Sequence, residues 1–490
     1  MTISLNRATA AAALALLLGG CVVGPDYKAP SLAIPASWKS ETAKPKTARP
    51  PLSEWWRNLN DPLLNALIEE AVMGNLDVAS AKAAIREARA TRRQVVGGLF
   101  PTVDGAADAD RTKTAATQTG TAKSVTATTY QAGFDASWEL DLFGATRREV
   151  EAATYGIDAA EEELRSTLLT LIGDVAQNYV EARGYQARIG LARRTAASQR
   201  ATAGLTKRKL DAGSASSVDV SNANGLAATT AAGIPSLEAS FAQSVHRLGV
   251  LTGRPPAALS ARMLAAKPIP TPRRPPAAGV PADVLLARPD VRRAERQLAQ
   301  YTAKIGQAQA ALYPSVSLTG SISTESSKIG DLAKRSTIGW SYGPSVNVPL
   351  FEGGSLRAAV TVAQAQRDQY FVAFKSSVLT ALEDVENALV SLAKERERTS
   401  ELSTAAASYR EAARLSRELY RAGSSDFLDV LDAERSLYDA EDSLLQSQTS
   451  AATDYVALSK ALGGGWTRPV DASRPEILDG SNGPGRVAGR

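Results

Sequence analysis

The sequence predicts an α/β membrane protein that combines four amphipathic β-strands with long helical hairpins. Four short segments alternate apolar and polar side chains, which is the pattern of membrane-spanning strands. Much longer patterns with helical periodicity follow them, from 146 to 210 and from 356 to 420. The second half of the 490-residue chain repeats the order of these elements. Strand alternation, helix length and internal duplication together predict the fold class.

The composition favours long helices over a compact globule. Aromatic residues make up 6% of the chain and hydrophobic residues 44%, which suits helices packed along seams of small residues. Basic residues are spread out without interleaved aromatic residues, so we expect no nucleic-acid partner. The single Cys excludes an intrachain disulfide, and the single His, His246, has no motif of metal ligands or of a nucleophile around it. We expect neither an enzyme nor a cofactor other than a covalent lipid.

Residues 1–20 have the features of a bacterial secretory signal peptide. Arg7 supplies the positive charge, and the apolar run from Ala8 to Leu18 is too short to span a bilayer as a mature helix. Leu-Gly-Gly before Cys21 resembles a lipobox and predicts that Cys21 is lipidated. Val22 stands where lipoproteins retained in the inner membrane of enteric bacteria carry Asp. This predicts the outer membrane of a Gram-negative bacterium.

The lipidated segment 21–60 has the composition of an extended, stiff tether. It contains six prolines between Pro25 and Pro51, which favour an extended backbone. We expect this tether to dock on the body of the protein at Trp55-Trp56. Asp61-Pro62 then supplies the N-cap and the first position of a helix that continues to about Gly98.

The first predicted β-hairpin comprises residues 102–141. In both of its strands apolar residues alternate with polar ones, and the polar face is acidic. That face would line the lumen of a barrel, although the solvent-exposed side of an ordinary sheet would have the same pattern. The acidic residues that we assign to the lumen are Asp104, Asp108, Asp110, Asp135, Glu139 and Asp141.

The second predicted β-hairpin, residues 315–350, has a small and neutral polar face. Its Trp340 and Tyr342 suit the aromatic girdle at a membrane interface. The hairpin lies where an internal repeat requires it, because Leu99-Phe100-Pro101 matches Leu312-Tyr313-Pro314 at an offset of 213 residues. Finding the alternation at both matching places favours the barrel.

The repeat divides the mature chain into two similar halves. In the second half, the apolar residues Phe371, Val378, Val385 and Leu392 follow a heptad spacing, which predicts coiled-coil packing. The expected parts are a first repeat at 61–253 with a helical hairpin at 146–251, a proline-rich connector at 254–289, a second repeat at 290–462 with a helical hairpin at 356–462, and a flexible tail at 463–490.

Each helical hairpin turns at a glycine, Gly213 in the first and Gly423 in the second. Glycine supplies the left-handed backbone conformation that ends a helix. After Gly423, Asp426 is placed to cap the next helix, with Asp429 as its capping-box partner. Asp429 and Asp432 also share one helix face, so the second turn carries a cluster of carboxylates.

Four strands in one chain cannot close a barrel, and open strand edges are not tolerated in lipid. Chains must therefore combine their strands, and three chains give twelve strands around an open lumen. The long helices would continue this barrel as an α-helical coiled-coil tube in the periplasm. We expect a homotrimer embedded in outer-membrane lipid.

Several motifs resemble those of TolC-like outer-membrane factors, in the NodT-like lipoprotein branch that serves resistance-nodulation-division (RND) efflux pumps. They are spread over nearly the whole mature chain in the right order. These motifs are Cys21-Val22-Val23-Gly24-Pro25-Asp26-Tyr27, Asp61-Pro62-Leu63-Leu64, Arg288-Pro289-Asp290-Val291-Arg292, Leu350-Phe351-Glu352-Gly353-Gly354, Tyr420-Arg421-Ala422-Gly423 and Leu431-Asp432-Ala433.

The resemblance implies a trimeric twelve-stranded barrel with a periplasmic helical barrel. It also implies a passive exit duct that docks onto a periplasmic adaptor and an inner-membrane RND-type pump and exports drugs or other toxic small molecules. In the family, a ring of Asp with a Leu ring beside it constricts the periplasmic tip; these map onto Asp429, Asp432 and Leu428. A tyrosine that ties the closed tip maps onto Tyr420, whereas Ser425 stands where its arginine partner would be.

Two other functions remain open from the sequence. The exit duct of a type I protein-secretion system has the same fold, and a neighbouring gene for a secretion ATPase would favour it. A periplasmic adaptor lipoprotein also carries helical hairpins, but it lacks paired amphipathic strands of bilayer length.

Overall fold

The computed structural model describes residues 22–39, 53–116, 124–272, 281–332 and 334–474. They fall into two compact units. The first, here the strand unit, comprises the residues up to Ser31, Ile85–Ala160 and Arg293–Phe374. The second, here the hairpin unit, comprises Leu32–Ala84, Glu161–Arg292 and the residues from Lys375 onward.

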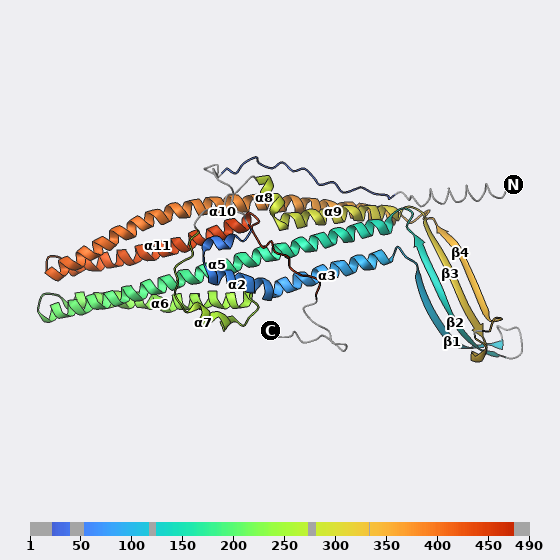
Figure 1. Cartoon of the computed structure of the whole chain (residues 1–490), viewed down its shortest axis with the longest axis horizontal. Coiled ribbons are helices and arrows are strands. Elements are labelled where there is room, and N and C mark those ends of the chain that lie inside the picture. Colours follow the sequence, from blue (N-terminus) through green and yellow to red (C-terminus); the bar gives the residue numbers. More distant parts are fainter. Residues whose placement is uncertain (1–21, 40–52, 117–123, 273–280, 333, 475–490) are drawn as a thin grey trace. The chain divides into compact units, whose positions relative to one another are not determined.

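The strand unit contains one antiparallel sheet in the order β1-β2-β3-β4 (Figure 1). The four predicted strands are confirmed within the hairpins expected at 102–141 and 315–350, although the second strands of these hairpins end at Leu140 and Asn347. The strands are β1 (Thr102–Thr114), β2 (Val125–Leu140), β3 (Ser315–Ser326) and β4 (Ile338–Asn347).

The register of the sheet keeps the two side-chain classes apart. Gly105 pairs with Phe134, Phe134 with Ile322, and Ile322 with Trp340, so that the apolar faces of all four strands form one surface. Because successive side chains point to opposite faces, the polar residues share the other surface. The predicted amphipathic pattern is thus continuous from strand to strand.

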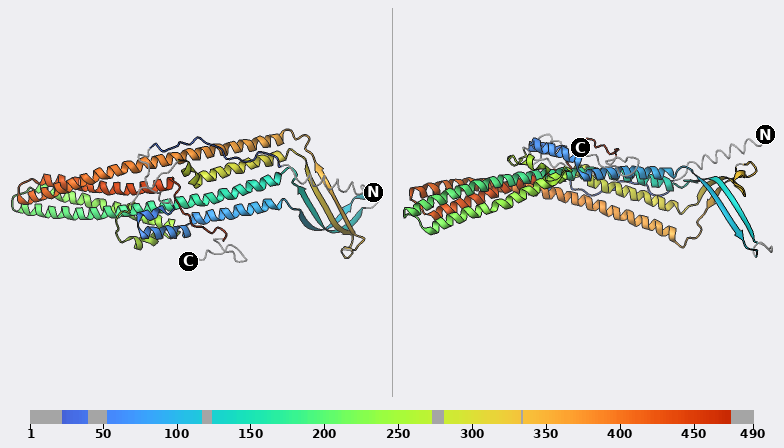
Figure 2. Two further views of the ribbon diagram at one scale, coloured as in Figure 1. Left: turned by 45° about the horizontal axis from the view of Figure 1, so that its top comes forward. Right: turned by 90° about the horizontal axis from the view of Figure 1, so that it is seen from below.

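The long helices turn where the sequence predicts. The first pair is α5 (Ala145–Asp211) and α6 (Ser217–Leu251), and the second is α10 (Ser355–Ala422) and α11 (Phe427–Ala461). Gly213 and Gly423 have φ values of 75° and 79°, in the left-handed region. Within the hairpin unit the four helices lie side by side in both views of Figure 2. In the described part of the chain, no helix has both the length and the apolar character needed to cross a membrane.

The predicted helix from Asp61 to Gly98 is two helices, α2 (Pro62–Gly74) and α3 (Leu76–Gly97). The expectation of one helix was wrong because Asn75 is extended and its side-chain oxygen accepts hydrogen bonds from the backbone N–H groups of Asp77 and Val78. Its side-chain nitrogen donates to the Leu251 carbonyl at 3.1 Å. A polar residue that caps the next helix thus interrupts the apolar periodicity. The predicted N-cap at Asp61 is confirmed.

An aromatic cluster fixes the start and the end of the hairpin unit to each other. In the short helix η1 (Trp55–Leu59), Trp55 and Trp56 are buried, as the sequence predicted for the docked tether. Trp466 stacks on Trp56 with ring centroids 6.2 Å apart, and Arg468 forms ion pairs with Glu54 and Glu69. The prediction of a loose tail from 463 was therefore wrong for residues 463–474; the remaining tail lies outside the described residues.

The segments between the two halves are short helices. The connector contains η2 (Pro256–Leu259), α7 (Ser260–Met263) and α8 (Pro281–Ala287), after which α9 (Pro289–Ala310) begins near the predicted Asp290. The three-residue helix η3 (Ile329–Asp331) lies between β3 and β4.

Candidate functional site

The turn between α5 and α6, here the first hairpin turn, is closed by its own backbone and side chains. Gly213 N–H donates to the Leu210 carbonyl, and Ser214 N–H donates to the Lys209 carbonyl. Ser216 and Asp219 then form a reciprocal capping box, with distances of 3.1 Å and 2.9 Å. Such a cap satisfies amide groups that the start of α6 would otherwise expose.

The turn between α10 and α11, here the second hairpin turn, lacks such a cap. Its carboxylates share one exposed face of α11, where Leu428 is 57% exposed and Asp429 and Asp432 are exposed beside it. Asp426 occupies the N-cap position but makes no side-chain capping hydrogen bond. The predicted capping box of Asp426 with Asp429 is therefore wrong. The carboxylate of Asp429 has no capping role, and its position in the first turn of α11 is favourable for the helix dipole.

Tyr420, the third residue before Gly423, is buried and not on the exposed face. Its ring packs edge-on against Phe427 at 5.8 Å, and its hydroxyl lies 3.3 Å from the Thr206 hydroxyl of α5. Lys209 places its ammonium group 4.3 Å from the centre of the ring and donates a hydrogen bond to the Tyr420 carbonyl. Tyr420 thus joins the two helical hairpins of one chain.

Lys209 and Thr206 were not found by sequence reasoning. They lie 211 and 214 positions before Tyr420, and no local pattern links positions so far apart. The basic residue over the ring comes from the other hairpin, whereas Ser425 occupies the position of the expected arginine. The internal repeat predicted from the sequence offered one signal, since it would align the turn after Lys209 with the turn after Tyr420.

Polar contacts continue the junction of the hairpins away from the turns. Arg188 on α5 binds Asp442 on α11 with two hydrogen bonds, of 2.7 Å and 2.9 Å. Glu434 on α11 is buried and accepts hydrogen bonds from Arg417 at 2.8 Å and from the Thr202 hydroxyl at 3.0 Å. Arg417 lies on α10, in the same hairpin as Glu434, so only the Thr202 hydrogen bond of this carboxylate crosses to the first hairpin.

Five of the six acidic residues predicted for the lumen lie on the polar face of the sheet. Asp104 and Asp135 are direct cross-strand partners, and Asp108 pairs with Gln131, whose partner on β3 is Glu325. Like charges directly opposite each other are unfavourable unless water and counterions screen them. The residues on this face are Asp104, Asp108, Asp110, Asp135 and Glu139.

Asp141 does not belong to this face, and its predicted position was wrong. β2 ends at Leu140, and the Asp141 carboxylate accepts hydrogen bonds from the backbone N–H groups of Thr146 and Arg147 at 3.1 Å and 2.9 Å. It also pairs with the Arg147 side chain at 3.1 Å. An acidic residue directly after a strand can equally well hold the start of the next helix, which is the role of Asp141 here.

The N-terminal tether is fixed to the strand unit by one buried arginine. Arg148 on α5 donates to the carbonyls of Val23 and Gly24, each at 3.1 Å, and pairs with Asp26 at 2.9 Å. Val22 packs so closely on Gly144 that a side chain there would meet it at 2.9 Å. Cys21, the predicted lipidation site, lies outside the described residues. Arg148 was not found from the sequence.

Comparison with known proteins identifies a family for this chain. A family model described as outer membrane efflux protein matches residues 67–254 and 280–464. The chain is similar to nodulation protein T of Rhizobium leguminosarum bv. trifolii, with 37% identity over 92% of this chain and 96% of that protein. It is also similar to the solvent efflux pump outer membrane protein SrpC of Pseudomonas putida, with 34% identity over 92% of this chain and 97% of that protein.

A solved structure agrees with the sequence relatives. The outer-membrane channel OprN matches with a TM-score of 0.85 and 36% identity, over 91% of this chain and 100% of that chain. The resemblance seen in the sequence motifs is thereby confirmed. The family model spans both halves of the chain, and the fold matches that of the solved channel. The chain therefore belongs to the outer membrane efflux protein family and is an outer-membrane efflux channel.

Proposed function

We propose that three copies of this chain form a passive exit duct, with a twelve-stranded barrel in the outer membrane and a helical tube in the periplasm. The observation that carries the proposal is the open four-stranded sheet, with one continuous apolar face and β1 and β4 as its edges. Unpaired strand edges are excluded from lipid, so the sheets of neighbouring chains must pair. Twelve strands enclose a lumen wide enough for solutes.

Internal duplication supports a tube of nearly equal helical hairpins. α5 has 67 residues and α10 has 68, and the returning helices α6 and α11 have 35 each. α3 and α9, which lead into the two β-hairpins, have 22 each. Two half-repeats of equal length in each of three chains would give six similar units around the axis.

The relatives support a proposal for the partners and substrates. SrpC belongs to a solvent efflux pump, so we infer that this chain receives small toxic molecules from an inner-membrane pump of RND type through a periplasmic adaptor. The chain itself supplies a path and not a reaction. The lumenal carboxylates and the narrowing at the tip would select what passes.

Conduction in planar bilayers tests this function. The purified protein should conduct as a trimer and prefer cations, because the five predicted carboxylates of each chain, together with Glu325, would converge on one lumen with low-dielectric walls. Asp104→Asn/Asp135→Asn should shift the reversal potential in a salt gradient toward zero. The shift should be larger at 10 mM salt, where the Debye length is roughly 30 Å, than at 1 M, where the Debye length is about 3 Å and the carboxylates are strongly screened.

Asp141→Asn is the matched control, because the Asp141 carboxylate binds the start of α5 and does not lie on the polar face of the sheet. This variant should leave ion selectivity unchanged. A conducting monomer would refute the proposed duct, and an anion preference of the unmodified protein would refute the lumenal position of the strand carboxylates. An unchanged reversal potential in the double variant would remove only the role of Asp104 and Asp135.

A second proposal concerns Cys21, which we infer to carry the covalent lipid. Arg148 fixes the backbone three residues further on, so the lipid would enter the membrane near the start of α5. Cys21→Ser should remove the thiol that accepts the lipid and block removal of the leader. Mass spectrometry of the N-terminal peptide should therefore show a retained, unlipidated leader in the variant. A lipid mass on the Cys21→Ser protein would contradict this assignment.

A third proposal assigns Asp429 and Asp432, with Leu428 beside them, to a ring that narrows the periplasmic tip. Three copies of the exposed face of α11 would gather six carboxylates, which should bind polyvalent cations. Asp429→Ala/Asp432→Ala should therefore weaken block by divalent cations added on the periplasmic side, measured as a higher half-blocking concentration. Stability should change by no more than about 1 kcal/mol, the size of a helix-dipole contribution.

Asp219→Ala is the control for this variant, because Asp219 holds the same position in the first turn and forms a capping box. It should cost about 1 kcal/mol of stability and leave cation block unchanged. Equal block in the double variant and the unmodified channel would place the constriction elsewhere.

A further inference from the structure

The charged residues of the four strands are sorted by sign between the two faces of the sheet. The acidic residues of β1 and β2, together with Glu325 on β3, lie on the polar face. Arg111 and Lys113 are the basic residues of the strands, and both lie on the apolar face. The register is unbroken to the end of β1, where Arg111 pairs with Thr128 and Lys113 with Thr126.

Both basic residues lie at one end of the sheet, here the distal end, where the connections 115–124 and 327–337 join the strands. Arg111 and Lys113 are exposed, and within the described residues neither forms an ion pair. The distal end of β1 thus carries two positive charges on the face that would meet lipid.

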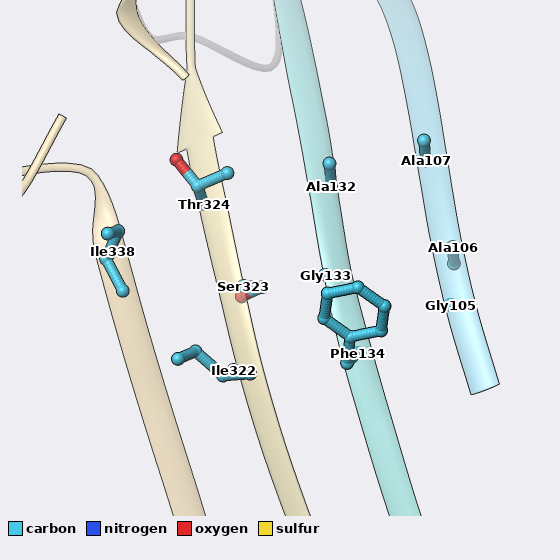
Figure 3. Close-up of a pocket in the computed structure, with 10 residues that line it drawn as sticks. All are labelled: Gly105, Ala106, Ala107, Ala132, Gly133, Phe134, Ile322, Ser323, Thr324 and Ile338. Carbon is cyan, nitrogen blue, oxygen red and sulfur yellow. The ribbon is translucent and has the colours of Figure 1, made fainter. Parts of the chain in front are cut away.

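An apolar hollow of about 490 Å³ lies on the same face (Figure 3). Gly105, Ala107 and Ala132 present little side chain there, and the larger Phe134, Ile322 and Ile338 border it. Phe134 lies against Gly105, where an added Cβ would meet the ring at 3.3 Å. Arg111 is four residues beyond Ala107 on β1, which corresponds to about 14 Å along the strand.

We propose that this face binds a phosphorylated glycolipid of the outer leaflet, of the lipid A class, with an acyl chain in the hollow and a phosphate group at Arg111 and Lys113. The inference rests on the proposed barrel, which puts the apolar face in contact with lipid. Complementary charge selects the occupant: two cations with no ion-pair partner among the described residues stand above an apolar hollow, so the ligand must be anionic at its head and apolar in its chain. Arginine and lysine both bind phosphate oxygens in this manner.

A lipid whose headgroup is neutral would fill the hollow without neutralising the two cations. A free anion would neutralise them without using the hollow. Only a phosphorylated lipid would use both the two cations and the apolar hollow. The test therefore measures separately how much the charges and how much the hollow contribute to binding.

The test measures binding of fluorescent hexa-acylated bisphosphoryl lipid A to the full-length channel in detergent, beside the same glycolipid with its phosphates removed. We expect the phosphorylated form to bind about tenfold more tightly or better, since each cation near an anionic lipid surface contributes several-fold in affinity. Arg111→Gln/Lys113→Gln should abolish that preference. Ala107→Trp, which fills the hollow, should weaken binding of both forms.

The control is Arg357→Gln/Lys375→Gln, which removes the same two charges from exposed positions on α10 and should bind as the unmodified protein does. Equal binding of the two glycolipids, an unaffected Arg111→Gln/Lys113→Gln variant, or full competition by inorganic phosphate at the same phosphate concentration would overturn the proposal. All variants should remain conducting trimers, so that failure of the unmodified protein to conduct would count against the duct and not against the lipid site.

Discussion

Replacing Tyr420 with alanine should loosen the junction between the two helical hairpins and open the tip of the channel. The ring is buried between Phe427 and Lys209, and truncation of a buried aromatic residue costs about 3–5 kcal/mol. The loss falls on contacts between α10 and α5, so the hairpins should separate locally before the protein unfolds. Hydrogen exchange at 203–210 and 418–431 should increase, single-channel conductance should rise, and cells should become sensitive to vancomycin.

Two further variants separate the contributions of the Tyr420 side chain. Tyr420→Phe removes only the long hydrogen bond to Thr206 and should cost about 1 kcal/mol or less. Tyr409→Ala is the matched control on the same helix, because Tyr409 is 44% exposed. Normal conductance and slow exchange in a folded Tyr420→Ala channel would mean that the closed tip does not depend on this junction.

The two turns of the hairpins were predictable because local chemistry determines them. A glycine in the left-handed conformation ends a helix wherever it stands, and apolar periodicity shows how long the helix is. The long helix expected from 146 to 210 accordingly runs from Ala145 to Asp211. The partners of Tyr420 were not predictable, because they depend on how two hairpins more than 200 residues apart pack.

Side-chain roles near the ends of elements were harder to predict than the elements themselves. The alternation of polar and apolar residues includes Asp141, although β2 ends one residue earlier. The Asp141 carboxylate instead accepts hydrogen bonds from backbone N–H groups at the start of α5. Asp426 has the residue type of a helix cap but makes no capping bond, whereas Ser216 in the first turn does. One residue type suits several roles at such boundaries, and only the local geometry of the backbone decides between them.

A buried network near the junction of α2 and α5 makes the hairpin unit depend on one charged residue. Arg183 is fully buried; it donates to the Ala265 carbonyl at 2.8 Å, to Gln186 at 2.5 Å and to the Tyr179 hydroxyl at 3.0 Å. The Tyr179 hydroxyl in turn donates to Asp61 at 2.5 Å. Burial, together with the hydrogen bond to Asp61, raises the pKa of Tyr179 well above its ordinary value, so the hydroxyl keeps its proton and remains a donor.

Arg183→Ala should destabilise the protein by about 3–5 kcal/mol, because it empties a large buried volume and leaves the Ala265 carbonyl and the Gln186 oxygen without their donor. Arg183→Met restores most of the volume and should recover part of the loss, with roughly 1–3 kcal/mol remaining for the unpaired acceptors. Arg200→Ala, at an exposed position on the same helix, should stay within about 0.5 kcal/mol of the unmodified protein. Denaturant unfolding followed by circular dichroism measures all three. If Arg183→Met were as stable as the unmodified channel, the arginine would serve only to fill space, and its hydrogen bonds to Ala265, Gln186 and Tyr179 would contribute nothing net to stability.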